Sequence, residues 1–310
     1  MRTPSISSRR RQRSAFTLVE LMVTMVIIAM LASLTLAGLA GARQRAKIDK
    51  TRSTIRKINE IILPQYESYL TRRVPVTGGD RTAIAQSRLL NKRRLMTLEM
   101  PDQWADVPVP PPLLATAPAR RYASIKTSGT RSPAYQSAEC LAMIVTRGGF
   151  NADAAEAFRN DELGDIDKDG APELLDGWGR PIAFIRWPAG YLSVVQPNNA
   201  TTDPDPLDPM RVTGTPPNND YGLVPLIYSA GPDEATNDPA TGVDPETSSS
   251  SGYGLVTSSI AVPTGWYAAF LTGTSNPSTR QGSPLAGAFM LPDGAQAARD
   301  NVTNHDLLKK

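Results

Sequence analysis

The chain has 310 residues, with 33 Lys or Arg, 30 Asp or Glu and a formal net charge of +3. A hydrophobic share of 40% is too high for a disordered chain and can supply a core, in one large domain or two ordinary ones. One cysteine, Cys140, excludes an intramolecular disulfide framework and a multi-cysteine zinc site, and one histidine, His305, leaves little room for a histidine-based triad.

Charge is unevenly distributed along the chain. Residues 1–64 carry 12 basic and 3 acidic side chains, residues 65–149 carry 12 and 6, and residues 150–248 carry 5 and 18. The basic N-terminal half of the chain and the acidic segment at 150–248 therefore need separate explanations. The basic run at 43–57 has no interleaved aromatic residues, so it indicates a solvated helix face beside anionic lipid and not a nucleic-acid site.

The N-terminus combines a basic stub with a long apolar segment. Five arginines precede Ser14, and residues 21–42 contain no charged side chain. About 20 apolar residues cross a bilayer as a helix, so this segment can span a membrane. A secretory signal cleaved after Ala42 and a plain signal anchor are two interpretations, but neither accounts for Glu20. A carboxylate at the edge of an apolar run is costly unless it is paired.

The string S-A-F-T-L-V-E-L at residues 14–21 resembles the processing site of type IV prepilins and type II secretion pseudopilins. The residues that match the family pattern are Phe16, Thr17, Leu18 and Glu20. Ala15 stands where glycine is usual. The resemblance implies that a prepilin peptidase cleaves between Ala15 and Phe16 and that the new Phe16 amine is methylated. It also implies that Glu20 pairs with the terminal amine of a neighbouring subunit during fibre assembly.

The helix is expected to continue beyond the membrane. Isoleucines recur on one helical face at positions 48, 55, 58 and 62, and Pro64 is expected to end or kink the helix. We therefore predict a leader at 1–15, a transmembrane half at 16–42 and an amphipathic half at 43–63. The head follows at 64–310, with insertions near 196–220 and 240–295.

Within the head, apolar patterns predict several short elements. Helices are expected at residues 83–98, at 137–145 and more briefly at 153–158. Strands are expected at 182–187, 191–195 and 223–229, the first two as a hairpin joined by P-A-G. Cys140 falls inside the second helix and is expected to be a core residue.

Residues 165–176 follow the register of a calcium loop. Oxygen-bearing acids stand at loop positions 1, 3, 5, 9 and 12, with Gly170 at position 6 for the sharp turn. The predicted calcium ligands in this loop are Asp165, Asp167, Asp169 and Asp176. The last of them is shorter than the usual glutamate and Pro172 restricts the loop, so a solvated acidic turn is the alternative interpretation.

Two further strings resemble parts of major pseudopilins. D-G-W-G-R-P-I at 176–182 is similar to a D-P-W-G-x-P-Y string at the start of their sheet, which implies a structural role for Trp178, Gly179 and Pro181. S-A-G-P-D at 229–233 is similar to the turn that opens their calcium loop. The resemblance implies calcium ligands at Asp233, Asp238, Asp300 and Asn301, against the alternative of a plain surface loop.

No nucleotide-binding, hydrolase or metalloprotease motif occurs, so we expect no catalytic residue, no enzyme activity and no cofactor other than Ca²⁺. The acid pairs at 161/162 and 203/205 are expected to be surface acids. The expected fold is α+β, a long N-terminal helix packed on an antiparallel sheet with a loop-rich head.

The leading functional hypothesis is a structural subunit of a type II secretion pseudopilus or a type IV pilus-like fibre. Its implied partners are prepilin peptidase, other pilin or pseudopilin subunits, an inner-membrane assembly platform and membrane lipid. It would cross the inner membrane once, with the head outside the cytoplasm. The alternatives are a minor or tip pilin with a binding head, and a secreted binding domain with a cleavable signal peptide.

Overall fold

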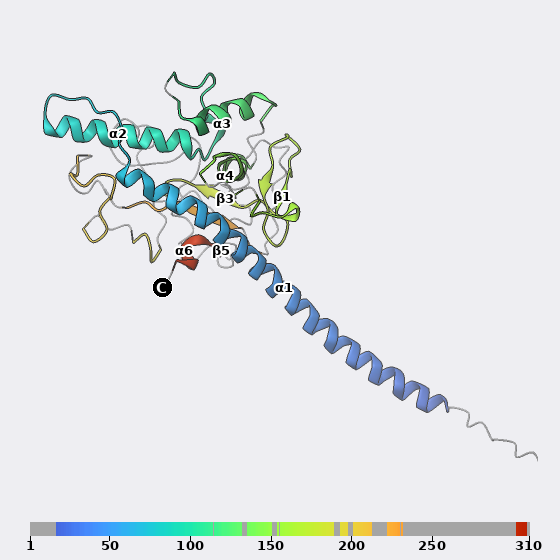
Figure 1. Cartoon of the computed structure of the whole chain (residues 1–310). Helices are drawn as coiled ribbons and strands as arrows, with labels where there is room; N and C mark the ends of the chain where they lie inside the picture. The colour runs from blue at the N-terminus through green and yellow to red at the C-terminus, as the bar shows by residue number, and fades with distance from the viewer. Residues whose placement is uncertain are drawn as a thin grey trace, which may run out of the picture. The chain divides into compact units, whose positions relative to one another are not determined.

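The computed structural model describes residues 17–113, 115–131, 135–150, 154, 156–188, 193–197, 201–212, 222–229, 231 and 302–308. The chain divides into two compact units, Met1–Ala46 and Lys47–Lys310. Helix α1 (Leu18–Thr71) supplies residues to both units (Figure 1). Its part in the first unit is rich in Leu, Met and Ala, which are strong helix formers.

Helix α1 does not end at Pro64. It continues through the proline to Thr71. A proline inside a helix removes one backbone donor, the one that would bond to the carbonyl group of Glu60. Both Pro64 and Glu60 are exposed, so water can hydrate that carbonyl group. Of the two outcomes expected at Pro64, a helix end or a kink, the end does not occur, because the exposed position of the proline makes the lost hydrogen bond inexpensive.

The isoleucine stripe of α1 packs into the core of the second unit. Ile55 and Ile58 are fully buried and Ile62 is 1% exposed, whereas Ile48 is half-buried. Two tyrosines one and two turns further on, Tyr66 and Tyr69, extend the same buried face. The face predicted from the 3.6-residue period is thus the one that carries the core contacts.

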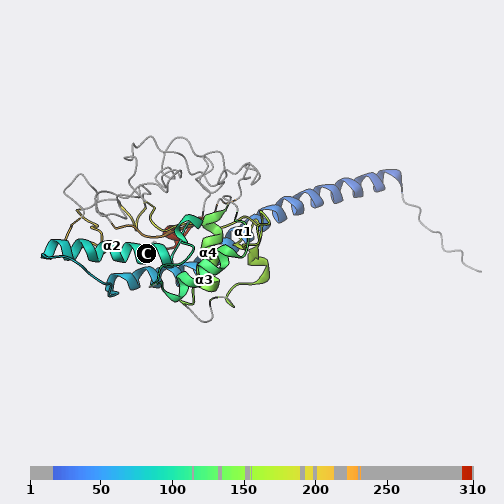
Figure 2. The same ribbon diagram turned by 90° about the horizontal axis from the view of Figure 1, so that it is seen from above.

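The remaining helices of the head are α2 (Arg81–Glu99), α3 (Ala117–Thr127), α4 (Gln136–Arg147) and α6 (Asn304–Leu307). Short 3₁₀ turns lie at Trp104–Asp106 and Asn160–Glu162. The Asp80 carboxylate caps α2 by accepting from the Ala83 N–H at 2.7 Å. The helices predicted at 83–98 and 137–145 are confirmed. Helix α4 packs against α3 and is buried along nearly its whole length, with Cys140 fully buried (Figure 2).

Two small antiparallel sheets occur within the described part of the chain. Strand β1 (Leu163–Gly164) pairs with β2 (Glu173–Leu174). Strand β4 (Leu226–Ser229) lies between β3 (Ala183–Ile185) and β5 (Val302–Thr303), with Phe184 opposite Ile227 and Tyr228 opposite Thr303. The predicted α+β fold, a long N-terminal helix followed by helices and small antiparallel sheets, is confirmed.

Two local predictions are wrong. Strand β3 pairs with β4 and not with a strand at 191–195, whose described part, 193–195, is not a strand. The backbone groups of Ser193 and Gln196 bond to each other at 3.0 and 3.3 Å, so they are taken up by a local turn. The described residues of the helix expected at 153–158 form turns.

Part of the insertion predicted near 196–220 packs on the head. Asp205 forms a buried ion pair with Arg93 of α2 at 3.0 Å, and Leu207 is buried in the core. The insertion predicted near 240–295 lies outside the described residues.

Candidate assembly helix and acidic loop

The first turn of α1 is closed by a reciprocal pair of side-chain bonds. The Thr17 N–H and hydroxyl both donate to Glu20 Oε2 at 3.0 Å, and the Glu20 N–H donates to the Thr17 hydroxyl oxygen at 3.2 Å. This is the capping box, in which a threonine and the glutamate three residues later satisfy the free donors of the helix start. The T-L-V-E string therefore begins the helix at Leu18 as well as carrying the family resemblance.

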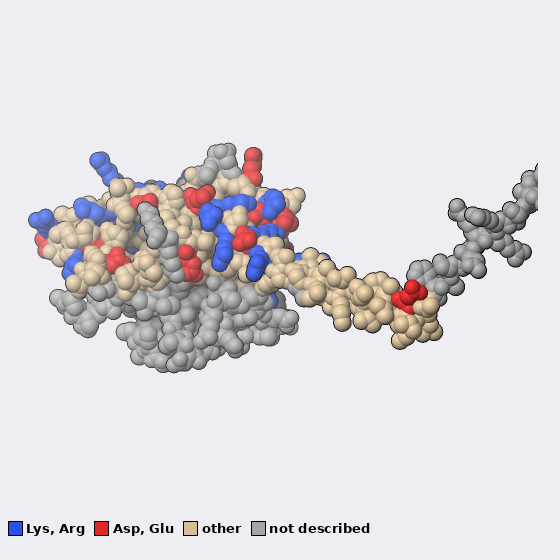
Figure 3. All heavy atoms as spheres, turned by 90° about the horizontal axis from the view of Figure 1, so that it is seen from below, with Lys and Arg blue, Asp and Glu red and all other residues tan. Residues whose placement is uncertain are grey.

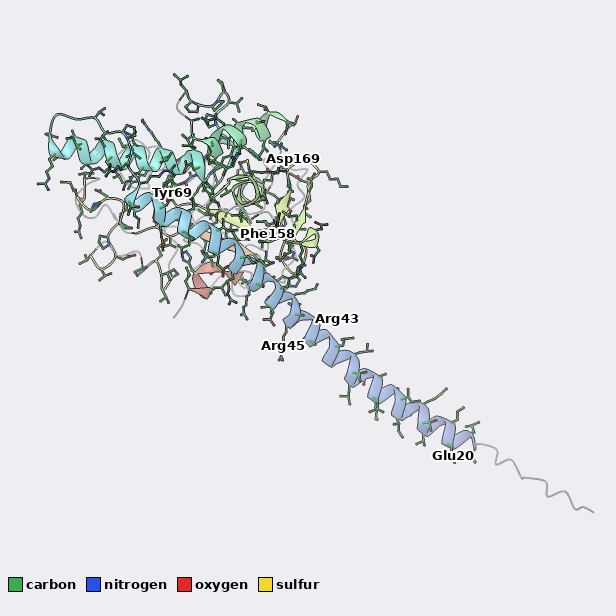
Figure 4. The ribbon with its side chains drawn as sticks, in the orientation of Figure 1. Glu20, Arg43, Arg45, Tyr69, Phe158 and Asp169 are labelled. Atoms are coloured by element: carbon green, nitrogen blue, oxygen red, sulfur yellow. The ribbon has the colours of Figure 1, made fainter. Side chains whose placement is uncertain are left out.

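Glu20 is the one charged side chain among residues 17–42. The apolar side chains that follow it are exposed on every side of the helix, for example Val26 at 53% and Leu34 at 70%. Charge returns at Arg43 and Arg45 (Figure 4). Within the described residues, α1 is the one helix long and apolar enough to cross a membrane. The predicted processing residues Ala15 and Phe16 lie outside the described residues.

The acidic loop at 165–170 turns sharply, as predicted. Gly170 has φ +88° and its N–H donates to Asp165 Oδ2 at 3.1 Å, while the Ala171 N–H donates to Asp169 Oδ1 at 2.8 Å. Asp169 is labelled in Figure 4. Asp165, Asp167 and Asp169 each place one oxygen within 4.8 Å of the others. Three of the four predicted loop ligands are therefore brought together.

The fourth, Asp176, is not with them. Its Oδ1 accepts from the Trp178 and Arg180 N–H groups at 2.7 and 3.0 Å, and its Oδ2 accepts from the Ser229 hydroxyl at 2.6 Å. The carboxylate thus holds the turn at 176–180 against β4. We correct its assignment from calcium ligand to turn-stabilising residue.

The turn after Asp176 carries the residues expected to be structural. Trp178 is half-buried, Gly179 adopts φ +80°, and Pro181 is buried in a bridge to Leu175. The turn approaches α1 closely at Gly177, where an added Cβ would lie 2.2 Å from the Lys47 carbonyl oxygen. The resembling family has proline at this position, and this close approach explains why the present chain has glycine.

The structure describes the single histidine of the chain but not the other predicted calcium ligands. Asp233, Asp238, Asp300 and Asn301 lie outside the described residues. His305, at the start of α6, is fully buried with Nδ1 2.8 Å from the Ser193 hydroxyl and Nε2 3.2 Å from the Val224 carbonyl oxygen. A carbonyl oxygen can only accept, so Nε2 carries the proton and Nδ1 accepts from the hydroxyl.

The expectation that the acid pairs at 161/162 and 203/205 are surface acids is wrong for Glu162 and Asp205, which are buried in ion pairs. Asp161 pairs with Lys50 at 2.7 Å, and the buried Glu162 pairs with Lys57 at 3.0 Å. Asp205 is held by Arg93, as described above. Carboxylates fixed in ion pairs are poor candidates for general acids, which need a free proton in a cleft.

Glu139 was missed by the sequence reasoning. It lies on α4 at 1% exposure, next to Cys140, and has an oxygen within 4.8 Å of oxygens of Asp167 and Glu173. The signal that could have found it is an acidic residue inside an otherwise buried apolar helix. Burial, with a smaller contribution from nearby acids, raises the pKa of Glu139 to about 10 and that of Glu173 to about 8.

In comparisons with known proteins, the N-terminal segment of the chain gives a match. A family model described as the prokaryotic N-terminal methylation motif covers residues 10–36. Comparison with curated proteins gives no match, and neither does comparison with solved structures. The matched residues include the predicted cleavage position, the capping box and residues 21–36 of the apolar segment. The chain is therefore a type IV pilin-like protein that carries the N-terminal methylation motif.

Proposed function

We propose that the chain is a structural subunit of a type II secretion pseudopilus or a related type IV pilus-like fibre. Prepilin peptidase would cleave it between Ala15 and Phe16, and α1 would carry it into the fibre. The observation that supports this most is the coincidence of the methylation motif with an exposed apolar segment, residues 17–42 of the chain, that has Glu20 as its single charge. The proposed role is assembly, with no catalytic step in the head.

The physical case rests on what surrounds the apolar helix. Exposed apolar side chains over 21–42 are stable in lipid or against neighbouring helices, and costly in water. In either place Glu20 needs a partner. Thr17 bonds to Glu20 Oε2, and within the described residues Oε1 accepts no hydrogen bond. That oxygen remains for the terminal ammonium group of a neighbour, and two charges that are costly alone compensate each other.

The rest of the chain fits a single-pass protein whose head lies outside the cytoplasm. The basic side chains at 43–57 follow directly after the apolar segment, where anionic lipid headgroups would attract them. The isoleucine stripe is covered by the chain's own head, so this half of α1 needs no other subunit to bury it. An inner-membrane assembly platform and other pilin or pseudopilin subunits are the proposed partners.

Substituting Glu20 by Gln tests the assembly step separately from cleavage. We expect the E20Q variant to be cleaved and retained in the membrane but to fall at least about tenfold in the fibre fraction, because it loses the charge that pairs with the incoming amine. Glu60→Gln, at an exposed position of the same helix, is the matched control and should assemble normally. Fibre assembly of E20Q at the wild-type level would contradict the proposal.

A minor or tip subunit with a binding head is the second candidate. A cavity of about 890 Å³ in the head favours it, because its rim is strongly basic. The arginines that line it are Arg120, Arg121, Arg131 and Arg147. Counting copies in isolated fibres separates the two roles, since a repeating subunit is found along the whole fibre and a tip subunit at one end.

A further inference from the structure

Three carboxylates from separate parts of the head meet below the surface. They are Glu139 on α4, Asp167 in the acidic loop and Glu173 on β2, and each has an oxygen within 4.8 Å of the others. Glu139 is 1% exposed and Glu173 is fully buried. Like charges placed this close in a buried position repel each other strongly unless a proton or a cation lies between them.

Glu139 and Glu173 each use one carboxylate oxygen in a hydrogen bond. The second oxygen of each accepts none from the described residues. Glu139 Oε2 accepts from the indole N–H of Trp104, and Glu173 Oε2 accepts from the Ile166 N–H at 3.0 Å. Glu139 Oε1 and Glu173 Oε1 are buried and accept no hydrogen bond within the described part of the head. A buried acceptor left unsatisfied costs about 1–3 kcal/mol, and more when it is charged.

The basic residues among the described part of the head do not pair with the two glutamates of this group. Arg131 is directed to Asp169, with Nη1 3.5 Å from its Oδ1 and 3.2 Å from its carbonyl oxygen. Neither Glu139 nor Glu173 forms an ion pair with a described residue. The two glutamates therefore lack the ion pairs that hold other buried acids, such as Glu162 and Asp205.

We propose that Glu139, Asp167 and Glu173 bind one Ca²⁺ ion, which fastens the acidic loop to α4. Calcium takes oxygen ligands at about 2.3–2.6 Å, so two oxygens on one ion lie at most about 5 Å apart. The three oxygens meet that condition. All are hard carboxylate oxygens without sulfur or imidazole, which favours Ca²⁺ over zinc or copper.

The surroundings complete the site. Glu139 and the loop residues Gly170 and Ala171 line the 890 Å³ cavity, which gives water access for the remaining ligand positions. Asp165 and Asp169 each place an oxygen within 4.8 Å of one on Asp167 and add negative potential. The site uses Glu139 where the loop register predicted Asp176, and it does not depend on the fibre proposal.

Terbium luminescence tests the site directly, because Tb³⁺ replaces Ca²⁺ and is sensitised by a nearby indole. The full chain in detergent, stripped with chelator, would be titrated with Tb³⁺ under tryptophan excitation. We expect emission that Ca²⁺ displaces, and a higher melting temperature with Ca²⁺ than with chelator. Because Trp104 bonds to Glu139, Trp104→Phe should remove most of the emission. The Ca²⁺-dependent rise in melting temperature should remain.

Substitutions of the ligands locate the ion. Glu139→Gln and Glu173→Gln should each weaken Ca²⁺ binding at least about tenfold. Glu156→Gln changes an exposed acid of the head that is not a proposed ligand and should leave binding unchanged. Unaltered affinity in both ligand variants would overturn this site, even if an ion binds elsewhere. If the variants fail to fold, the wild-type chain still decides: no emission and no Ca²⁺-dependent melting shift would overturn the proposal.

Discussion

Leu31 in the first unit is 58% exposed, whereas Arg186 in the second unit is fully buried. An exposed leucine and a buried arginine are both unfavourable in a water-soluble protein, and the contrast extends along residues 17–42 and the described part of the head. Residues 17–42 of the first unit are apolar on their outside, with one acidic group near the end, while basic and acidic side chains are scattered over the described part of the second unit (Figure 3). The comparison teaches that the head buries its own apolar residues in water, whereas the first unit needs lipid or neighbouring subunits.

Arg186 lies at the centre of a buried network of charges in the head. Arg186 donates to Asp106 Oδ2 at 2.9 Å and to the Met100 carbonyl oxygen at 2.7 Å, and it lies 3.4 Å from Asp102 Oδ1. Its guanidinium group also stacks over the Trp187 ring, 4.2 Å from the centroid. This network ties the segment before α3 to the end of β3.

The largest expected effect comes from breaking that network. Arg186→Met should lower the free energy of unfolding of the head by about 3–5 kcal/mol, because two buried carboxylates lose their cation. Arg88→Met removes an exposed arginine of α2 and should change it by less than about 0.5 kcal/mol. Denaturant unfolding followed by fluorescence measures both. Equal stability of the two variants would mean that the buried charges of the head are not essential.

The same substitution at one exposed leucine in each unit sharpens the contrast. Leu31→Arg should disfavour membrane insertion by roughly 2.5–3.5 kcal/mol, because it puts a charge in the middle of the apolar segment. Leu113→Arg, at a fully exposed position of the head, should have no effect. The fraction of each variant that resists alkaline extraction from membranes is the measurement. Full retention of the Leu31 variant would show that its exposed apolar face does not lie in lipid.

The smallest expected effect concerns His305 and pH. Burial lowers its pKa to about 4, whereas an unfolded histidine titrates near 6.5. Between these values the unfolded state binds more protons, so the head loses stability as pH falls from about 6.5 to about 4, by at most about 3 kcal/mol. His305 is the single histidine of the chain, so the slope of stability against pH should be shallower in His305→Gln. Identical slopes would show that the pKa of this imidazole is the same in the folded and unfolded states.

Local patterns predicted the parts of the fold that depend on local physics. The helices at 83–98 and 137–145 and the isoleucine stripe follow from a 3.6-residue period, and the turn at Gly170 from the need for positive φ. The strand pairing was not predictable, because β3 bonds to β4 across a long insertion. Whether Pro64 ends the helix could not be decided from the sequence. The cost of the lost hydrogen bond depends on the exposure of the proline, which is a tertiary property.

The carboxylates of the acidic loop and Glu139 also show that a local sequence pattern does not predict contacts between distant residues. The loop register predicted that Asp165, Asp167 and Asp169 lie close together, and they do. It also assigned Asp176, which the fold uses to hold a turn against Ser229. Glu139 takes part because α4 packs on β2, a contact between residues far apart in sequence. A one-dimensional pattern carries no information about such a neighbour.

The central claim is that the exposed apolar unit is a processing and assembly segment. The most direct test is mass spectrometry of the N-terminal peptide of the mature chain, isolated from membranes of cells that express prepilin peptidase. The account predicts a chain that begins at N-methylated Phe16 and retains Glu20 and the whole apolar segment. A mature chain that begins at Arg43 would contradict it, since the apolar segment would then be a removed signal, and so would one that still carries its first fifteen residues.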